Sequence, residues 1–168
     1  MSKLKFLLIV FVFVLPFIFA KYFFDNDATS TRGTTNHGSF LVDEINITSL
    51  ADNDHWIILQ VIDGKCDTSC QDNMHMLRQI NTALGKDMGR VKRYLLHKNT
   101  NENTVYLDNY PKVIVLENSE SLYNKLTKME EEIFIADPFG KIILGYKQDF
   151  VAKGFLKDLK KLLKYSKI

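Results

Sequence analysis

The chain has 168 residues, of which 46% are hydrophobic and 25% are charged, and its formal net charge at pH 7 is +2. This is the composition of an ordinary globular domain, and the charge is too small and too evenly spread to predict a nucleic-acid partner. Because the chain holds only two cysteines, a disulfide-rich scaffold is excluded as well.

The amino terminus contains one exceptional apolar segment, FLLIVFVFVLPFIFA, at residues 6–20. Lys21 follows this segment, and three aromatic residues, Tyr22, Phe23 and Phe24, come directly after that lysine. At about 1.5 Å per residue, residues 6–24 are just long enough for a helix that crosses a hydrocarbon core of roughly 30 Å. We therefore predict a membrane anchor at residues 1–24, formed by a single transmembrane helix.

A cleaved signal peptide is the alternative reading of the same segment. It requires small residues before the cleavage site, where this chain has Ile18, and Lys21 would follow the cut. Lys3 and Lys5 precede the apolar run, which favours an amino terminus in the cytoplasm. In a bacterium the anchor would then lie in the inner (cytoplasmic) membrane, as a single pass, with the rest of the chain facing the periplasm.

Residues 25–36 are small and polar and lack apolar periodicity, so they are predicted to form a flexible tether. A folded domain is expected at residues 37–168. It opens with two short segments that have weak strand character, at residues 38–42 and 45–48.

The first half of this domain has the pattern of a βαβ unit. Residues 55–62 are apolar throughout, as expected for a strand buried on both faces. A helical pattern follows at residues 67–84, and a second apolar strand is predicted at residues 91–97. The two strands should therefore be parallel and joined by a right-handed crossover.

The second half is predicted to contain a short strand, a helix, a hairpin and a final helix. Their expected ranges are 112–117, 119–129, 132–136 with 141–146, and 150–165. The order β-α-β followed by α-β-β-α predicts an α/β domain with a thioredoxin-like fold.

The final helix is predicted to be amphipathic. Its apolar stripe consists of Val151, Phe155, Leu159, Leu162 and Leu163. Its polar face carries Lys153, Lys157, Lys160, Lys161 and Lys164. These lysines are interpreted as a solvated face, with contact to anionic lipid or to an acidic partner as the alternative.

Both cysteines lie in the sequence GKCDTSCQDN, directly after the first buried strand. A strand that ends in a polar loop and opens a helix delivers side chains to the carboxyl edge of a sheet. Residues i and i+4 are neighbours on a helix, so Cys66 and Cys70 can close a disulfide or bind one soft metal ion. His97 ends the strand predicted to be parallel, and it should therefore emerge at the same edge.

The motif Cys66-Asp67-Thr68-Ser69-Cys70, the membrane anchor and the hairpin turn DPFG together resemble the Sco (SenC) family. The segments LRQINTALGKDMGRV, DPFGKIILGY and KGFLKDLKKLL are similar to a divergent proteobacterial subset of Sco-like proteins. The resemblance covers about residues 38–165. It implies a thioredoxin-fold copper chaperone that helps to assemble the dinuclear copper centre of cytochrome c oxidase.

The same resemblance implies a Cu(I) site with two thiolate ligands, Cys66 and Cys70. The family's third ligand is a histidine before the hairpin, and Met129 stands nearest to that position here. His97 and Met129 are therefore the candidates for the third ligand, because imidazole and thioether groups both suit Cu(I). A solvated loop histidine and a core methionine are the alternative roles of these residues.

Three functions remain open at this point. The first is a Sco-like accessory protein of cytochrome c oxidase assembly, with the oxidase's copper-site subunit or another Sco-type protein as its partner. The second is a periplasmic thiol-disulfide oxidoreductase that uses Cys66 and Cys70 as its redox pair, since a helix amino terminus stabilises a thiolate. The third is a non-catalytic assembly factor without metal. For the cysteine pair itself, a structural disulfide is a separate alternative.

Overall fold

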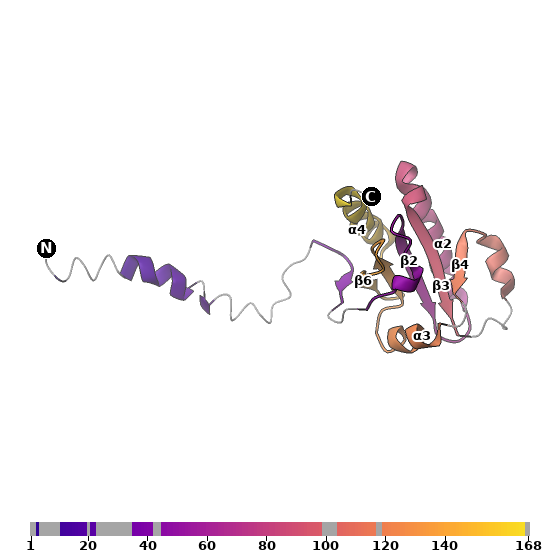
Figure 1. Cartoon of the computed structure of the whole chain (residues 1–168), viewed down its shortest axis with the longest axis horizontal. Coiled ribbons are helices and arrows are strands. Elements are labelled where there is room, and N and C mark those ends of the chain that lie inside the picture. Colours follow the sequence, from indigo (N-terminus) through magenta and orange to yellow (C-terminus); the bar gives the residue numbers. More distant parts are fainter. Residues whose placement is uncertain are drawn as a thin grey trace. The chain divides into compact units, whose positions relative to one another are not determined.

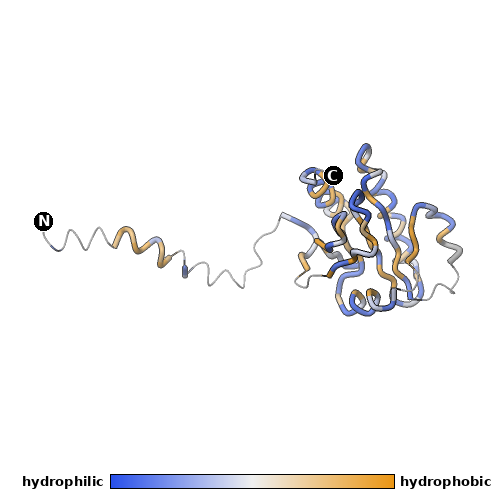
Figure 2. Tube along the Cα trace, viewed as in Figure 1, coloured by the Kyte–Doolittle hydropathy of each residue, from blue (hydrophilic) through white to orange (hydrophobic). Residues whose placement is uncertain are grey.

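The chain divides into two units, Met1–Thr35 and Asn36–Ile168. The structure is a computed structural model, and it describes residues 3, 11–19, 21–22, 35–41, 45–98, 104–116 and 119–166. In the first unit, residues 11–19 form an apolar helix, coloured orange in Figure 2.

Half of the predicted anchor at residues 1–24 and nearly all of the tether at residues 25–36 lie outside the described residues. Within the part of the chain that the structure describes, no helix has both the length and the apolar character needed to cross a bilayer.

The second unit is built on one mixed sheet of six strands, in the order β1-β6-β5-β2-β3-β4 (Figure 1). The strands are β1 (Ser39–Phe40), β2 (Trp56–Ile62), β3 (Val91–His97), β4 (Val113–Leu116), β5 (Ile133–Ala136) and β6 (Ile142–Tyr146). Strands β2, β3 and β4 are parallel to one another, whereas β5 and β6 form an antiparallel hairpin that pairs with β2 through β5. The predicted βαβ unit and hairpin are both confirmed.

Helices cover both faces of this sheet, which explains why every residue of β2 is buried. The helices are α2 (Thr68–Ala83), α3 (Glu120–Leu126) and α4 (Ala152–Tyr165). Short 3-10 helices at Thr48–Leu50, Gly85–Arg90 and Thr104–Asn109 complete the described secondary structure.

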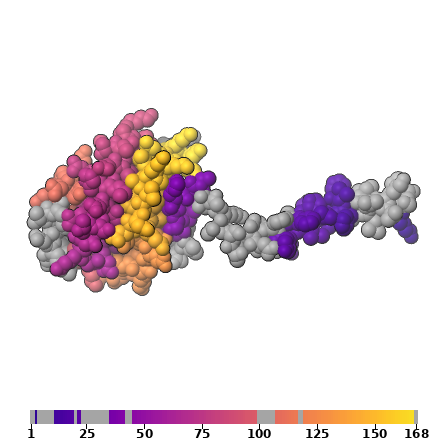
Figure 3. All heavy atoms as spheres, turned by 180° about the vertical axis from the view of Figure 1, so that it is seen from behind, coloured from indigo at the N-terminus to yellow at the C-terminus, as the bar shows by residue number. Residues whose placement is uncertain are grey.

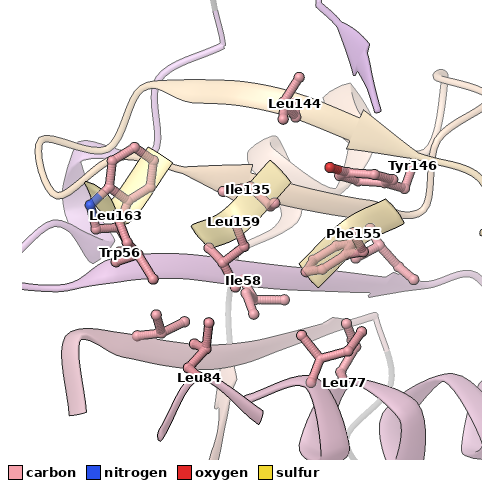
Figure 4. Packing of buried hydrophobic residues seen from close by; sticks show 13 residues of the cluster. Trp56, Ile58, Leu77, Leu84, Ile135, Leu144, Tyr146, Phe155, Leu159 and Leu163 are labelled. Atoms are coloured by element: carbon pink, nitrogen blue, oxygen red, sulfur yellow. The ribbon is translucent and has the colours of Figure 1, made fainter. Parts of the chain in front are cut away.

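Alternate residues of β2 belong to two separate cores. Ile58 packs with Leu77 of α2 and with Phe155 and Leu159 of α4, as Figure 4 shows. Its neighbours Ile57 and Leu59 face the other core, which includes Tyr123 and Leu126 of α3. The period-two alternation of a strand thus joins the two helical layers through a single element.

Two sequence predictions about the strands and helices of this unit are wrong. Residues 45–48 do not form a strand: only Asn46 makes a bridge, to Lys141, and the 3-10 helix starts at Thr48. The sequence predicts that Val151 belongs to the apolar stripe of the last helix, but Val151 is exposed because it occupies the extended N-cap position, before the first helical turn. Phe155, Leu159 and Leu163 are buried as predicted.

The hairpin turn packs against the segment that precedes β2. The backbone N–H of Ile47 donates to the carbonyl oxygen of Gly140 at 2.6 Å. Gly140 has a φ of +87°, and a Cβ at this position would lie 2.8 Å from backbone atoms of Ile47 and Thr48. The turn therefore requires glycine for its conformation and for this close approach.

One buried carboxylate ties the start of the second unit to its last helix. The Oδ2 atom of Asp158 accepts hydrogen bonds from the backbone N–H groups of His37 and Gly38 and from the hydroxyl of Tyr146. Burial is the largest cause that raises the pKa of Tyr146, and the negative charge of Asp158 is the second. The hydroxyl of Tyr146 therefore keeps its proton and remains a donor. Figure 3 shows α4, in yellow, beside the purple residues that open this unit.

Candidate functional site

Cys66 and Cys70 form a disulfide at the point where β2 gives way to α2. Their Cα atoms lie 5.2 Å apart. Asp67 is the N-cap of α2, and its Oδ1 atom accepts from the backbone N–H of Cys70 at 2.9 Å. The side chain of Asp67 therefore starts the helix between the cysteines, and Cys70 falls in the first helical turn as predicted.

The two sulfur-bearing residues differ in burial. Cys66 is half-buried, whereas only 7% of Cys70 is exposed. Cys70 packs with Ile62, Met74 and Leu95 in a small apolar cluster. Cys66 is consequently the cysteine that a second protein can reach. Cys70 lies on the buried side of the disulfide, from which its sulfur can attack the sulfur of Cys66.

Gln60 adds a polar contact to the buried cysteine. Its Nε2 atom donates to the carbonyl oxygen of Cys70 at 3.3 Å and lies 3.9 Å from the Cys70 sulfur. No sequence motif marks Gln60 as a functional residue. The available signal was that Gln60 is the only polar side chain in the strand WIILQVI.

His97 reaches the predicted edge of the sheet but not the predicted environment. The register of β2 and β3 pairs His97 with Ile62, so both strands end together. Only 8% of His97 is exposed, and its Nε2 atom lies 2.7 Å from the carbonyl oxygen of Gly64. The interpretation as a solvated loop histidine is therefore wrong, since a carbonyl oxygen accepts this bond and His97 supports the cysteine loop.

Met129 lies in the same cleft as Cys70. This cleft has a volume of about 210 Å³ between the end of β2, the start of α2 and the segment before β5. Met129 is partly buried against the core on the α3 side of the sheet, and it also lines the cleft wall. Both roles proposed from the sequence thus fit its position, whereas His97 is absent from the cleft lining.

The cleft beside Cys70 is acidic. Five carboxylate side chains line it, those of Asp63, Asp67, Glu130, Glu131 and Glu132, together with the single cation Lys65. Glu132 is exposed, but desolvation by the residues around it, and then the charges of Asp67 and Asp63, raise its pKa. In the adjacent core, burial and a hydrogen bond to Asp63 raise the pKa of Tyr123 to about 12.

Two further observations bear on the chemistry of the site. Among the described residues, no group of three or more His, Cys, Asp or Glu side chains is arranged to hold a metal ion. The described backbone has no cis peptide bond, and Glu130 to Glu132 precede β5 where classical thioredoxins present a cis-proline.

A family profile described as "Transmembrane-like, thioredoxin-like, C-terminal domain" matches residues 56–166. The chain belongs to this family. The matched range starts at the first residue of β2 and includes both cysteines and all of α4. A search of curated proteins found no match.

Solved structures similar to this family member include copper-bound and redox proteins. Yeast Sco1 with copper bound is 14% identical, with a TM-score of 0.55 over 67% of this chain and 80% of that protein. Arabidopsis thaliana ScoI with copper bound is 16% identical, with a TM-score of 0.53 over 67% and 86% of the two chains. The thioredoxin domain of a thiol-disulfide oxidoreductase from Bacteroides vulgatus is 14% identical, with a TM-score of 0.52 over 74% and 96%.

At these identities the similarity shows the fold alone. It confirms a thioredoxin-like α/β fold for this member of the family. Copper-binding and thiol-exchanging proteins both share the fold, so the choice between these chemistries depends on the residues around Cys66 and Cys70.

The raised pKa of Glu132 generates a prediction about stability. A folded-state pKa above the unfolded value means that the folded state favours the protonated carboxyl, so stability falls as the pH rises through that pKa. We expect Glu132→Gln to raise the Tm by about 1 to 3 °C at pH 7 and to leave it unchanged near pH 4, in thermal unfolding of the full chain.

Glu130→Gln is the matched control for this measurement. The hydrogen bond from Lys147 lowers the pKa of Glu130, so this substitution should not raise the Tm at pH 7. An equal rise in both variants would contradict the assignment of the effect to Glu132.

Proposed function

We propose that this chain is a membrane-anchored, Sco-like accessory protein that exchanges disulfides with a client protein through Cys66 and Cys70. The proposed client is the copper-site subunit of cytochrome c oxidase or another Sco-type protein, and the proposed location is the periplasmic side of the inner membrane. The observation that carries the proposal is the disulfide at the carboxyl end of β2, with one half-buried and one buried cysteine.

This arrangement is poorly suited to a purely structural bond. Cys66 and Cys70 are separated by only four positions in the sequence, so their disulfide closes a very short loop. Such a bond removes little conformational entropy from the unfolded chain. The site also opens into a cleft beside Cys70, which gives a client segment room to approach.

Exchange follows from the difference in burial. In the reduced protein, the Cys66 thiolate attacks a client disulfide, forms a mixed disulfide and releases one client thiolate. The Cys70 thiolate then attacks the Cys66 sulfur, restores the Cys66–Cys70 disulfide and releases the second client thiolate. Two electrons pass from the protein to the client, and an external dithiol reductant must return them.

Gln60 and Asp67 position the inner cysteine for the second step. Asp67 holds the backbone N–H of Cys70, and Gln60 holds its carbonyl oxygen. His97 fixes the outer loop through Gly64, two residues before Cys66. These three contacts are expected to hold the cysteine loop in place when the disulfide is reduced, so that the two sulfur atoms stay close enough to react.

Oxidised glutathione tests the assigned roles in the reduced full chain, held in detergent. Cys70→Ser should form a stable mixed disulfide at Cys66, about tenfold faster than Cys66→Ser forms one at Cys70, because thiol exchange depends on access. The wild-type chain should release the glutathione and close its own disulfide. Equal rates in the two variants, or faster reaction at Cys70, would contradict the proposal.

Cu(I) binding is the second candidate function, and the position of Met129 favours it. The reduced pair offers two thiolates, and two soft donors, the sulfur of Cys70 and the thioether of Met129, line the same cleft. Cys66 does not line this cleft, but it is adjacent to Cys70 through the disulfide. His97 fits less well as the third ligand, because its Nε2 atom is bonded to Gly64.

Titration of the reduced full chain with Cu(I) against a competing chelator tests this second candidate. If copper is bound, the stoichiometry should be one ion per chain, and binding should be lost in Cys66→Ser and Cys70→Ser. Met129→Ala should weaken it by about tenfold or more, while His97→Ala should have the smaller effect. Absence of cysteine-dependent binding would leave disulfide exchange as the function.

A further inference from the structure

A second hollow lies at the opposite end of β2 from the disulfide. It has a volume of about 500 Å³, and its lining includes the apolar residues Phe40, Trp56, Phe139, Ile143, Leu162 and Tyr165. We call these residues the aromatic groove. Trp56 is the first residue of β2 and Ile62 the last, so about 20 Å of strand separates the groove from the cysteine loop.

Three large aromatic side chains at the groove are open to solvent. The exposed fractions are 52% for Phe40, 60% for Phe139 and 73% for Tyr165. They come from three separate elements: the edge strand β1, the hairpin turn and the end of α4. Exposed apolar surface gathered from several elements marks an interaction site.

The rim of the groove is basic. Lys161 lines it, the Nζ atom of Lys164 lies 5.8 Å from the ring centre of Tyr165, and Lys141 is exposed just beyond the hairpin turn. The acidic residue in the lining is Asp137, whose Oδ1 atom accepts from two backbone N–H groups of the turn. Lysine charges beside exposed aromatic rings match the surface of an anionic bilayer.

The chain enters the domain at this same groove. Asn36 lines the groove, and its Oδ1 atom accepts from the Nζ atom of Lys161 at 3.2 Å. Asp158 then holds the backbone of His37 and Gly38 against α4. Residues 25–36 span at most about 40 Å when fully extended, so an anchor at residues 1–24 keeps the groove close to the bilayer.

We propose that the aromatic groove docks on the anionic lipid surface of the membrane that holds the anchor. The inference rests on the proposed anchor. Phe40, Phe139 and Tyr165 enter the headgroup region, while the lysines face the lipid phosphates. Docking in this way turns the disulfide end of the sheet away from the bilayer, toward a client.

Trp56 provides the probe for this proposal, because it is the only tryptophan of the chain and it lines the groove. The full chain is reconstituted into vesicles of phosphatidylglycerol and phosphatidylcholine that contain bromine-labelled acyl chains. We expect the bromine to quench Trp56 fluorescence, and we expect less quenching in vesicles of phosphatidylcholine alone or in high salt.

Matched variants on α4 separate docking from mere proximity. Lys161→Gln with Lys164→Gln should reduce the ratio of docked to undocked protein by about thirtyfold, since two lysines near an anionic surface are lost. Lys153→Gln with Lys157→Gln removes the same charge from the other end of α4, outside the groove lining, and should leave the quenching almost unchanged.

Three outcomes would overturn the proposal: no quenching in anionic vesicles, equal quenching in uncharged vesicles, or equal effects of the two lysine pairs. The first would assign the groove to a protein partner instead. Vesicle flotation tests the anchor separately. A chain that does not float with the vesicles would overturn both the proposed anchor and the docking proposal that rests on it. Glutathione exchange in detergent reports on Cys66 and Cys70 independently, so loss of docking and loss of the proposed function are distinguishable.

Discussion

The parallel pairing of β2 with β3 is the constraint on which the candidate site depends. Its register runs from Trp56 beside Val91 to Ile62 beside His97, so both strands end at one edge of the sheet. The cysteine loop leaves β2 at that edge, and His97 meets it there through the carbonyl oxygen of Gly64. Because β2 is buried on both faces, a shift of this register would misplace two cores as well as the site.

The chemistry of the site follows from unequal burial around two sulfur atoms. Cys70 is enclosed by apolar neighbours and held at both backbone groups by Asp67 and Gln60, whereas Cys66 lies in the outer loop. This asymmetry supports an attacking and a resolving cysteine. The acidic cleft and Met129 border the inner cysteine, so the same space is available to a client segment or to a soft metal ion.

Much of the fold could be predicted because hydrophobic periodicity determines where strands and helices lie. The strand predicted at residues 91–97 agrees with β3, and the predicted helix at residues 67–84 includes both caps of α2. The environment of single side chains was harder to predict. His97 was placed at the correct edge, but its bond to Gly64 depends on the path of a loop that carries no periodic signal. Gln60 was missed because a buried amide in a strand becomes meaningful only when its neighbour across space is known.

The central claim is that Cys66 and Cys70 form a reversible redox pair at an accessible edge of the sheet. The most direct test is the midpoint reduction potential of their disulfide in the full chain, measured by equilibration against defined dithiol buffers. A catalytic or regulatory pair at such a site should have a potential above about −300 mV. A potential well below that value would show that the bond resists biological reductants, and it would contradict the account in favour of a structural disulfide.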